Sequence, residues 1–128
     1  TIDAAMEAKK NGVKIIAVSS SEWQSKMPED HFIRHPNKTN LFDYADVCIE
    51  DFNPVGDAVV TVPGLETPIA PVSNIIDFYI AHLLEIETVK QCIDIGITPP
   101  VWSSANTPGG DEKNAKYLKK YRPQVKML

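Results

Sequence analysis

The first eighteen residues constrain the fold most, because a helix pattern is followed at once by a buried-strand pattern. Thr1 is a suitable N-cap and Gly12 a suitable stop, which predicts a helix over residues 2–11. The β-branched run over residues 13–18 predicts a strand buried on both faces, as in a parallel sheet. Helix, glycine turn and strand form the second half of a βαβ unit, which needs a preceding strand. We therefore expect the chain to enter an α/β domain part-way through its fold.

The middle of the chain predicts a long loop, a second strand and a small hairpin. Residues 19–40 are polar and irregular, and a connection of this length is usually functional or mobile. Residues 41–44 predict a short helical turn, and residues 45–49 a second strand. The segments 58–62 and 67–70 predict a hairpin or an extended arm.

Two helices are expected in the last part of the chain. Ser73 is a suitable cap for a helix that runs to about residue 95, where Gly96 follows as a stop. Apolar residues cover more than one stripe of this helix, which predicts burial on several sides and a place at a subunit interface. The segment from Asp111 to Tyr121 predicts a final basic helix, with Asp111 well placed to cap it.

The charge of the chain gives no support for a nucleic-acid partner. The formal net charge is -4 and the isoelectric point is about 5.3. Six of the 13 basic residues lie in residues 113–128, where there is no acid, and such a tail more often docks on its own body or a sister subunit. No apolar run approaches the length of about 18 residues that a membrane helix needs, so we expect no membrane partner. We also predict no cofactor.

The two cysteines indicate a reducing compartment. Cys48 and Cys92 each lie in an apolar run, and their spacing is not that of a metal site. Lone cysteines of this kind predict buried free thiols and a cytoplasmic protein.

The order of segments resembles the second half of a sugar isomerase (SIS) domain. The pieces that carry the general resemblance are the strand "VKIIAVSSS", the strand "YADVCIED" and the long apolar helix after "PVSN". More specific pieces resemble an uncharacterised bacterial family of SIS proteins related to phosphoheptose isomerase. These are "RHPNKTNLFDYADVCIED", "PVGDA" and "GITPPVWSSANTPGGDEKN", and the similarity extends over essentially the whole chain.

The resemblance implies a fold, a ligand and an assembly. It implies a Rossmann-like three-layer α/β/α sandwich with a parallel sheet, of which residues 1–128 form one domain without its N-terminal strands and first phosphate loop. It further implies a phosphorylated sugar bound at the carboxyl ends of the strands, and a homodimer or homotetramer.

Three consecutive serines are the first candidates for ligand contact. Ser19, Ser20 and Ser21 follow the first strand, where hydroxyl and backbone N–H groups can hold phosphate without a permanent charge. Serine is also common where a strand simply runs out into a solvated loop. The SIS resemblance favours the ligand interpretation.

The long loop holds a second candidate group, formed by His31, Arg34, His35 and Lys38. Arg34 or Lys38 could supply positive charge to a phosphate, and His35 could transfer a proton near neutral pH. The alternative is an ordinary exposed polar loop. The resemblance favours His35 and Lys38. A metal site from His31, His35 and a carboxylate is a further alternative, although a loop lacks the geometry that places both histidines on one face.

The remaining candidates lie on the long helix and in the closing loop. His82 and Glu85 are three residues apart and share a helix face. Related isomerases use a histidine on the corresponding helix for proton transfer, while a satisfied core or interface histidine is the alternative. Ser104 and Asn106 are candidates for binding the ligand of a neighbouring subunit, and a loop shaped for docking and capping is their alternative interpretation. Asp57 is a weaker candidate of the same kind.

The sequence leaves three functions open. The first is an enzyme acting on a phosphorylated sugar, either an isomerase or a related lyase, with His35 or His82 as the base. The second is a non-catalytic module that senses sugar phosphates. The third is a structural fragment that binds nothing by itself.

Overall fold

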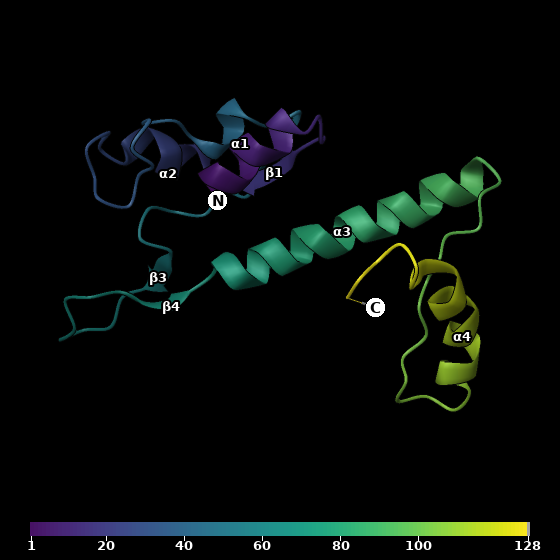
Figure 1. Cartoon of the computed structure of the whole chain (residues 1–128). Helices are drawn as coiled ribbons and strands as arrows, with labels where there is room; N and C mark the ends of the chain where they lie inside the picture. The colour runs from purple at the N-terminus through teal and green to yellow at the C-terminus, as the bar shows by residue number, and fades with distance from the viewer. Residues whose placement is uncertain (128) are drawn as a thin grey trace. The chain divides into compact units, whose positions relative to one another are not determined.

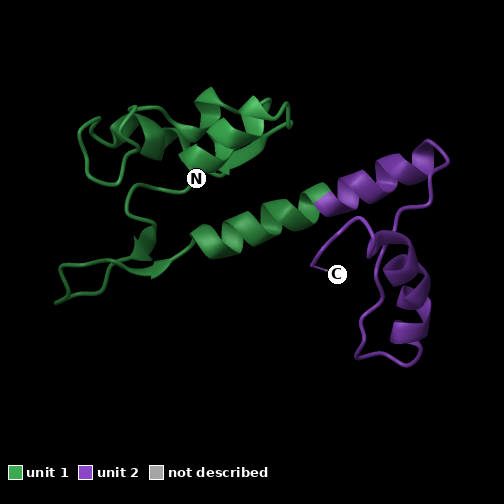
Figure 2. Cartoon of the chain, in the orientation of Figure 1, with its two compact units in different colours: residues 1–84 green, residues 85–128 purple. Residues whose placement is uncertain are grey.

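The computed structural model describes residues 1–127, which form two compact units that divide between residues 84 and 85 (Figure 2). Figure 1 labels the helices and most of the strands in chain order. The elements are α1 (Ile2–Lys10), β1 (Ile16–Ser19), α2 (Ser21–Lys26), the 3-10 turn η1 (Leu41–Asp43), β2 (Val47–Glu50), β3 (Ala58–Val60), β4 (Ile69–Pro71), α3 (Ser73–Asp94) and α4 (Gly110–Tyr121). The fold is mixed α/β, and its helices and strands largely follow the predicted order.

The first unit contains a small parallel sheet. Strands β1 and β2 pair in register from Ile16 opposite Val47 to Ser19 opposite Glu50. The prediction that this strand is buried on both faces is wrong for this chain, because Ile16 is 60% exposed while Ala17 is 2% exposed. One face of the strand is therefore covered and the other is open. Parallel pairing nevertheless brings the polar residues that follow the two strands to one edge of the sheet.

Asp46 fixes the start of this sheet. Its carboxylate accepts hydrogen bonds from the backbone N–H of Ile15 at 3.0 Å, from Lys14 Nζ at 3.0 Å and from Lys9 Nζ at 3.1 Å. These contacts hold the pKa of Asp46 well below its ordinary value, the backbone hydrogen bond contributing most. Asp46 thus ties the end of α1 and the entry to β1 to the residue that precedes β2.

Helix α2 is absent from the sequence prediction, which expected irregular structure over residues 19–40. Ser20 is its N-cap and accepts a hydrogen bond from the backbone N–H of Trp23 at 3.2 Å. Glu50, at the end of β2, accepts the backbone N–H of Ser21 on both carboxylate oxygens, at 3.1 and 3.0 Å. The start of α2 is therefore capped partly by a residue of the neighbouring strand, and the residues around α2 in the sequence indicate only part of this cap.

The predicted hairpin is confirmed. Strands β3 and β4 pair antiparallel, with Ala58 opposite Pro71 and Val60 opposite Ile69. The predicted helical turn over residues 41–44 is confirmed as η1, and the long helix is confirmed as α3.

The burial expected for α3 and for the cysteines is not found in this chain. No residue of α3 is buried, and Phe78 is 69% exposed. Cys48 is exposed, and Cys92 on α3 is half-buried; both are free thiols. Among residues 1–127, the buried apolar residues are only Ala5 and Ala17, so this chain encloses a small core. No helix within those residues is long and apolar enough to cross a membrane.

The second unit contains the closing loop and α4. The side chain of Asn114 accepts the backbone N–H of Ser103 at 2.8 Å and donates to its carbonyl at 2.7 Å. The rings of Trp102 and Tyr117 also pack together, with centroids 5.7 Å apart. Asp111 does not cap α4 as expected. The helix begins one residue earlier, and Gly109 occupies the cap position with a left-handed φ of 76°.

A candidate ligand site at the strand ends

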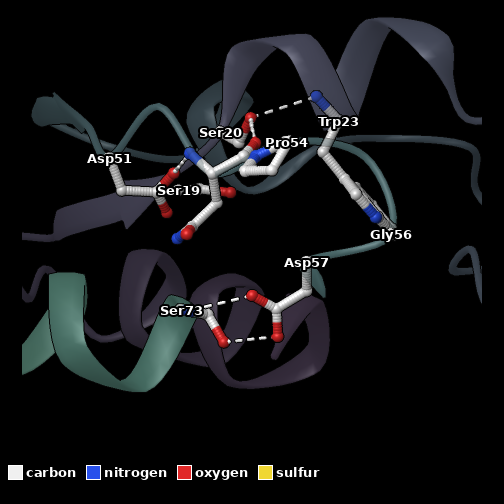
Figure 3. Close-up of a pocket in the computed structure, with 9 residues that line it drawn as sticks. Ser19, Ser20, Trp23, Asp51, Pro54, Gly56, Asp57 and Ser73 are labelled. Carbon is white, nitrogen blue, oxygen red and sulfur yellow. Dashed lines mark hydrogen bonds between the residues drawn. The ribbon is translucent and has the colours of Figure 1, made fainter. Parts of the chain in front are cut away.

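A cavity of about 240 Å³ opens at the carboxyl ends of β1 and β2, within the first unit. We call it the strand-end cavity. Figure 3 shows Ser19, Ser20 and Asp51 on one side of it and Asp57 with Ser73 on the opposite side. Its lining residues are Ser19, Ser20, Trp23, Asp51, Asn53, Pro54, Gly56, Asp57 and Ser73. Ligands of parallel α/β sheets bind at this edge, which makes the cavity the first candidate site.

The predicted serine cluster lies at this cavity, but much of its hydrogen-bonding capacity is already used. Ser20 is buried, and its hydroxyl donates to the carbonyl of Asn53 at 2.7 Å while it caps α2. The backbone N–H of Ser21 is bonded to Glu50. Hydrogen bonding with Ser21, and then with the backbone of Phe52, lowers the pKa of Glu50. Ser19 lines the strand-end cavity and also the cavity next to it.

The charged side chains that line the strand-end cavity are both acidic. Asp51 is 8% exposed and accepts the backbone N–H of Asn53 at 2.8 Å. Asp57 accepts the backbone N–H groups of Val72 and Ser73 and the Ser73 hydroxyl, and these bonds, that of the hydroxyl first, lower its pKa. Loss of surrounding water, and then the charges of Asp51 and Asp57, raise the pKa of nearby Asp77. The electrostatic potential in this cavity is therefore negative.

A second cavity, also of about 240 Å³, shares Ser19 and Trp23 with the first. We call it the loop cavity, because residues of the long loop form much of its wall. Its charged side chains are Arg34 and His35, and its other lining residues are Thr1, Ile2, Gln24, Ile33, Thr39, Asn40 and Leu41. Two adjoining cavities of opposite charge thus meet at the end of β1.

Arg34 is held rigidly at the loop cavity. Its guanidinium donates to the carbonyl of Met27 from Nε at 3.1 Å and from Nη2 at 2.7 Å, to Asn40 Oδ1 at 2.7 Å, and to the carbonyl of Gln24. The three acceptors of these four bonds are uncharged oxygens, so the bonds fix the group without neutralising its charge.

His35 lies beside Arg34 and contacts α1. Its Nε2 is 3.0 Å from a carboxylate oxygen of Asp3, and its Nδ1 is 3.3 Å from the backbone N of Asn37. Hydrogen bonding with Asn37 and with Asp3 raises the pKa of His35 above its ordinary value. A larger share of the imidazole is therefore positively charged near neutral pH, which favours an anion beside it, and the share in the neutral form that can accept a proton is smaller.

The other predicted site residues are not among those that line these two cavities. Lys38 pairs with Glu29 at 3.4 Å on the exposed loop and lines neither cavity. His82 lies on the exposed surface of α3 and lines neither cavity. Ser104 accepts the backbone N–H of Asn106 at 3.2 Å within the closing loop of the second unit. Within residues 1–127, no three histidine, cysteine or acidic side chains are grouped so that they could hold a metal ion.

Sequence reasoning missed several residues of the two cavities as site candidates, among them Trp23, Gln24, Asp51 and Asn53. The last two follow β2 as the serines follow β1, so the rule that drew attention to the serines could also have found them. Trp23 and Gln24 could be placed only once α2 was known.

Comparison with known proteins finds relatives but no matching family model. A UPF0309 protein of Thermoanaerobacter pseudethanolicus is 36% identical over 129 aligned positions, which take in 99% of this chain and 51% of the relative. A UPF0309 protein of Caldanaerobacter subterraneus is 33% identical with the same coverage. One of Geobacillus kaustophilus is 32% identical over 127 positions, covering 99% of this chain and 49% of the relative. The chain spans about half the length of the curated relatives it matches.

Proposed function

We propose that this chain forms part of a binding site for a phosphorylated sugar. The observation that carries the proposal is the pair of adjoining cavities at the end of β1, one acidic and one cationic, which share Ser19 and Trp23. A sugar phosphate carries hydroxyl donors at one part and an anionic group at another, and the two cavities offer a partner to each. The SIS resemblance of the sequence supports the same ligand class.

A thermal-shift screen of the purified protein against sugar phosphates tests this proposal. We expect at least one member of a broad panel to raise the melting temperature in a concentration-dependent way, because a ligand that binds only the folded state stabilises it. The matching unphosphorylated sugars serve as controls and should give smaller shifts. If no sugar phosphate in the panel raises the melting temperature, the proposal is wrong.

The reaction that we propose is aldose–ketose isomerisation or a related lyase step, and His35 is its candidate base. His35 borders the loop cavity, whereas His82 borders neither cavity, so the geometry favours His35. Replacing His35 by Ala should abolish turnover and retain binding. A protein that binds a sugar phosphate but never converts it would instead support the alternative, a module that senses sugar phosphates.

The finer architecture and the assembly are proposals of the same kind. We propose that β1 and β2 belong to a larger parallel sheet in a three-layer α/β/α sandwich of the SIS type. We also propose that the protein is cytoplasmic and that a second copy of the chain covers α3. The support for the last point is that α3 exposes a series of large apolar side chains, namely Ile75, Phe78, Tyr79, Leu83 and Ile86.

A further inference from the structure

Trp23 and Ser19 line both the strand-end cavity and the loop cavity. Trp23 is half-buried, and Figure 3 shows its side chain extending from α2 toward Gly56. Each cavity alone, at about 240 Å³, is smaller than the roughly 300–1,000 Å³ of most small-molecule sites, whereas the two together reach that range. A ligand that occupies both cavities would therefore pass along Trp23.

The indole of Trp23 is not used by the hydrogen bonds of the protein. Within residues 1–127, the hydrogen bonds of Trp23 are made by its backbone, and its ring packs against no other aromatic ring. The fully buried side-chain atoms without a partner in that range belong to Gln24 and Asn53, so Nε1 of Trp23 is accessible. An indole N–H can only donate, so Nε1 offers a donor to an acceptor on a ligand.

Trp102 is the other tryptophan of the chain, and its surroundings are different. Its ring packs against Tyr117 in the second unit, with centroids 5.7 Å apart, and it is not among the residues that line either cavity. The chain therefore contains one tryptophan at the candidate site and one that serves as a matched control.

The face of an indole ring suits a sugar better than a phosphate. Its π-electrons make the face negative, which attracts the weakly positive C–H groups of a sugar ring and repels phosphate oxygens. The N–H at the edge of the same ring can donate to a sugar hydroxyl oxygen. An aromatic wall with few polar groups is also typical of small-molecule sites.

We infer that Trp23 is the sugar-binding platform of the site. The sugar ring stacks on its indole, and a sugar hydroxyl oxygen accepts the Nε1–H. This inference rests on the proposed function and adds to it a residue that recognises the sugar part of the ligand.

The first test observes Trp23 directly in the purified protein. Trp102→Phe leaves Trp23 as the only tryptophan, and Trp23→Phe leaves Trp102. The ligand is fructose 6-phosphate, or whichever sugar phosphate stabilises the protein most in the thermal-shift screen. At saturation it should change the fluorescence of Trp102→Phe and leave that of Trp23→Phe unchanged. In wild-type protein, NMR should show that the indole N–H signal of Trp23 shifts and that of Trp102 stays in place.

Calorimetry on two variants separates the two parts of the contact. Trp23→Phe keeps an aromatic ring and removes the N–H, so we expect it to weaken binding of the sugar phosphate by roughly threefold to tenfold. Trp23→Leu removes the ring as well and should weaken binding by about a further tenfold. The matching unphosphorylated sugar should lose affinity by the same factors. Inorganic phosphate should bind both variants as it binds wild type, because its oxygens gain nothing from the ring.

Two controls keep the outcome clear. Trp102→Leu makes the same change of side chain in the second unit and should leave every affinity unchanged. The NMR titration of the wild-type protein does not depend on how the variants fold.

The results separate failure of the inference from failure of the proposed function. If no sugar phosphate binds the wild-type protein, both fail. If one binds but the indole N–H signal of Trp23 stays in place, or if Trp23→Leu binds it as tightly as wild type, only the inference is overturned. The inference is also wrong if Trp23→Leu weakens binding of inorganic phosphate as much as binding of the sugar, because Trp23 would then not act on the sugar part.

Discussion

Asp57 caps α3 from sixteen residues upstream, through Ser73. Its Oδ1 accepts the backbone N–H of Ser73 at 2.8 Å, and its Oδ2 accepts the Ser73 hydroxyl at 2.8 Å. Asp57 follows Gly56 in a left-handed conformation with φ of 64°, which aspartate tolerates better than most residues. This contact joins the hairpin to the long helix and forms one wall of the strand-end cavity (Figure 3).

Asp57→Asn should destabilise the first unit, because the charged cap at the start of α3 is lost. We expect a fall in melting temperature of roughly 3–8 °C at neutral pH. The folded-state pKa of Asp57 is lowered, so its contribution is present above the unfolded pKa of about 4 and is lost as pH falls through the folded value. The difference between variant and wild type should therefore shrink below pH 4. A difference that stays constant with pH would contradict the assignment.

Asp77→Asn should stabilise the protein at neutral pH. The folded-state pKa of Asp77 is raised, so its contribution favours folding only below the unfolded pKa and is lost as pH rises through the folded value. Removing its charge avoids the loss of hydration around it and also relieves repulsion from Asp51 and Asp57, and we expect the melting temperature to rise by roughly 1–3 °C. Asp94→Asn, at the last residue of α3, is the control and should have no such effect. A melting temperature of Asp77→Asn equal to or below that of wild type would argue against the repulsion.

An NMR titration of His35 should give a pKa above the ordinary value of about 6.5. Its folded-state pKa is raised, so its contribution to stability is full below pH 6.5 and is lost as pH rises through the folded value. Asp3→Asn removes the paired carboxylate and should bring the pKa of His35 down. Glu7→Gln, on the same helix, should leave that pKa unchanged. An equal titration in Asp3→Asn and wild type would show that the pair does not form in solution.

Gly110→Ala should disrupt the closing loop of the second unit. An added Cβ would overlap the backbone carbonyl of Ser104, so the loop would have to move. We expect a loss of about 3 kcal/mol in the free energy of unfolding of this unit. Gly12→Ala is the matched comparison, because its Cβ would meet open space but its φ is 70°, which predicts a loss of only about 1 kcal/mol. Chemical denaturation of both variants checks the order, and equal losses would contradict it.

Phe78→Glu should dissociate the proposed oligomer. Phe78 is among the most exposed apolar residues of α3, and a carboxylate there would be costly to bury at an interface. Size-exclusion chromatography with light scattering should show the wild-type protein as a dimer or larger and the variant as a smaller species. Asp94→Lys at the end of α3 is the control. A monomeric wild-type protein at micromolar concentration would rule out the proposed second copy.

Local sequence patterns predicted most of the secondary structure. The helix before Gly12, the hairpin and the two C-terminal helices follow from spacing, turn residues and helix stops that act within a few residues. Helix α2 was missed because half of its cap comes from Glu50, which lies on another strand. A similar limit explains why the predicted burial of α3 is not found in this chain. An apolar pattern on a helix indicates a surface that can be buried, but it does not indicate which element buries that surface.

The sequence by itself determined most of the elements, α2 excepted, and that serines, a histidine and an arginine follow the first strand. Only the tertiary structure decided that Ser19 lines one cavity with Asp51 and Asn53, and that Gln24 lines another with Arg34. Those contacts depend on the parallel pairing of β1 with β2 and on the turn of α2. Parallel pairing is a long-range contact, whose free energy depends on loop closure and burial rather than on neighbouring residues. The lining and the charge of each cavity therefore emerge only when the strands are side by side.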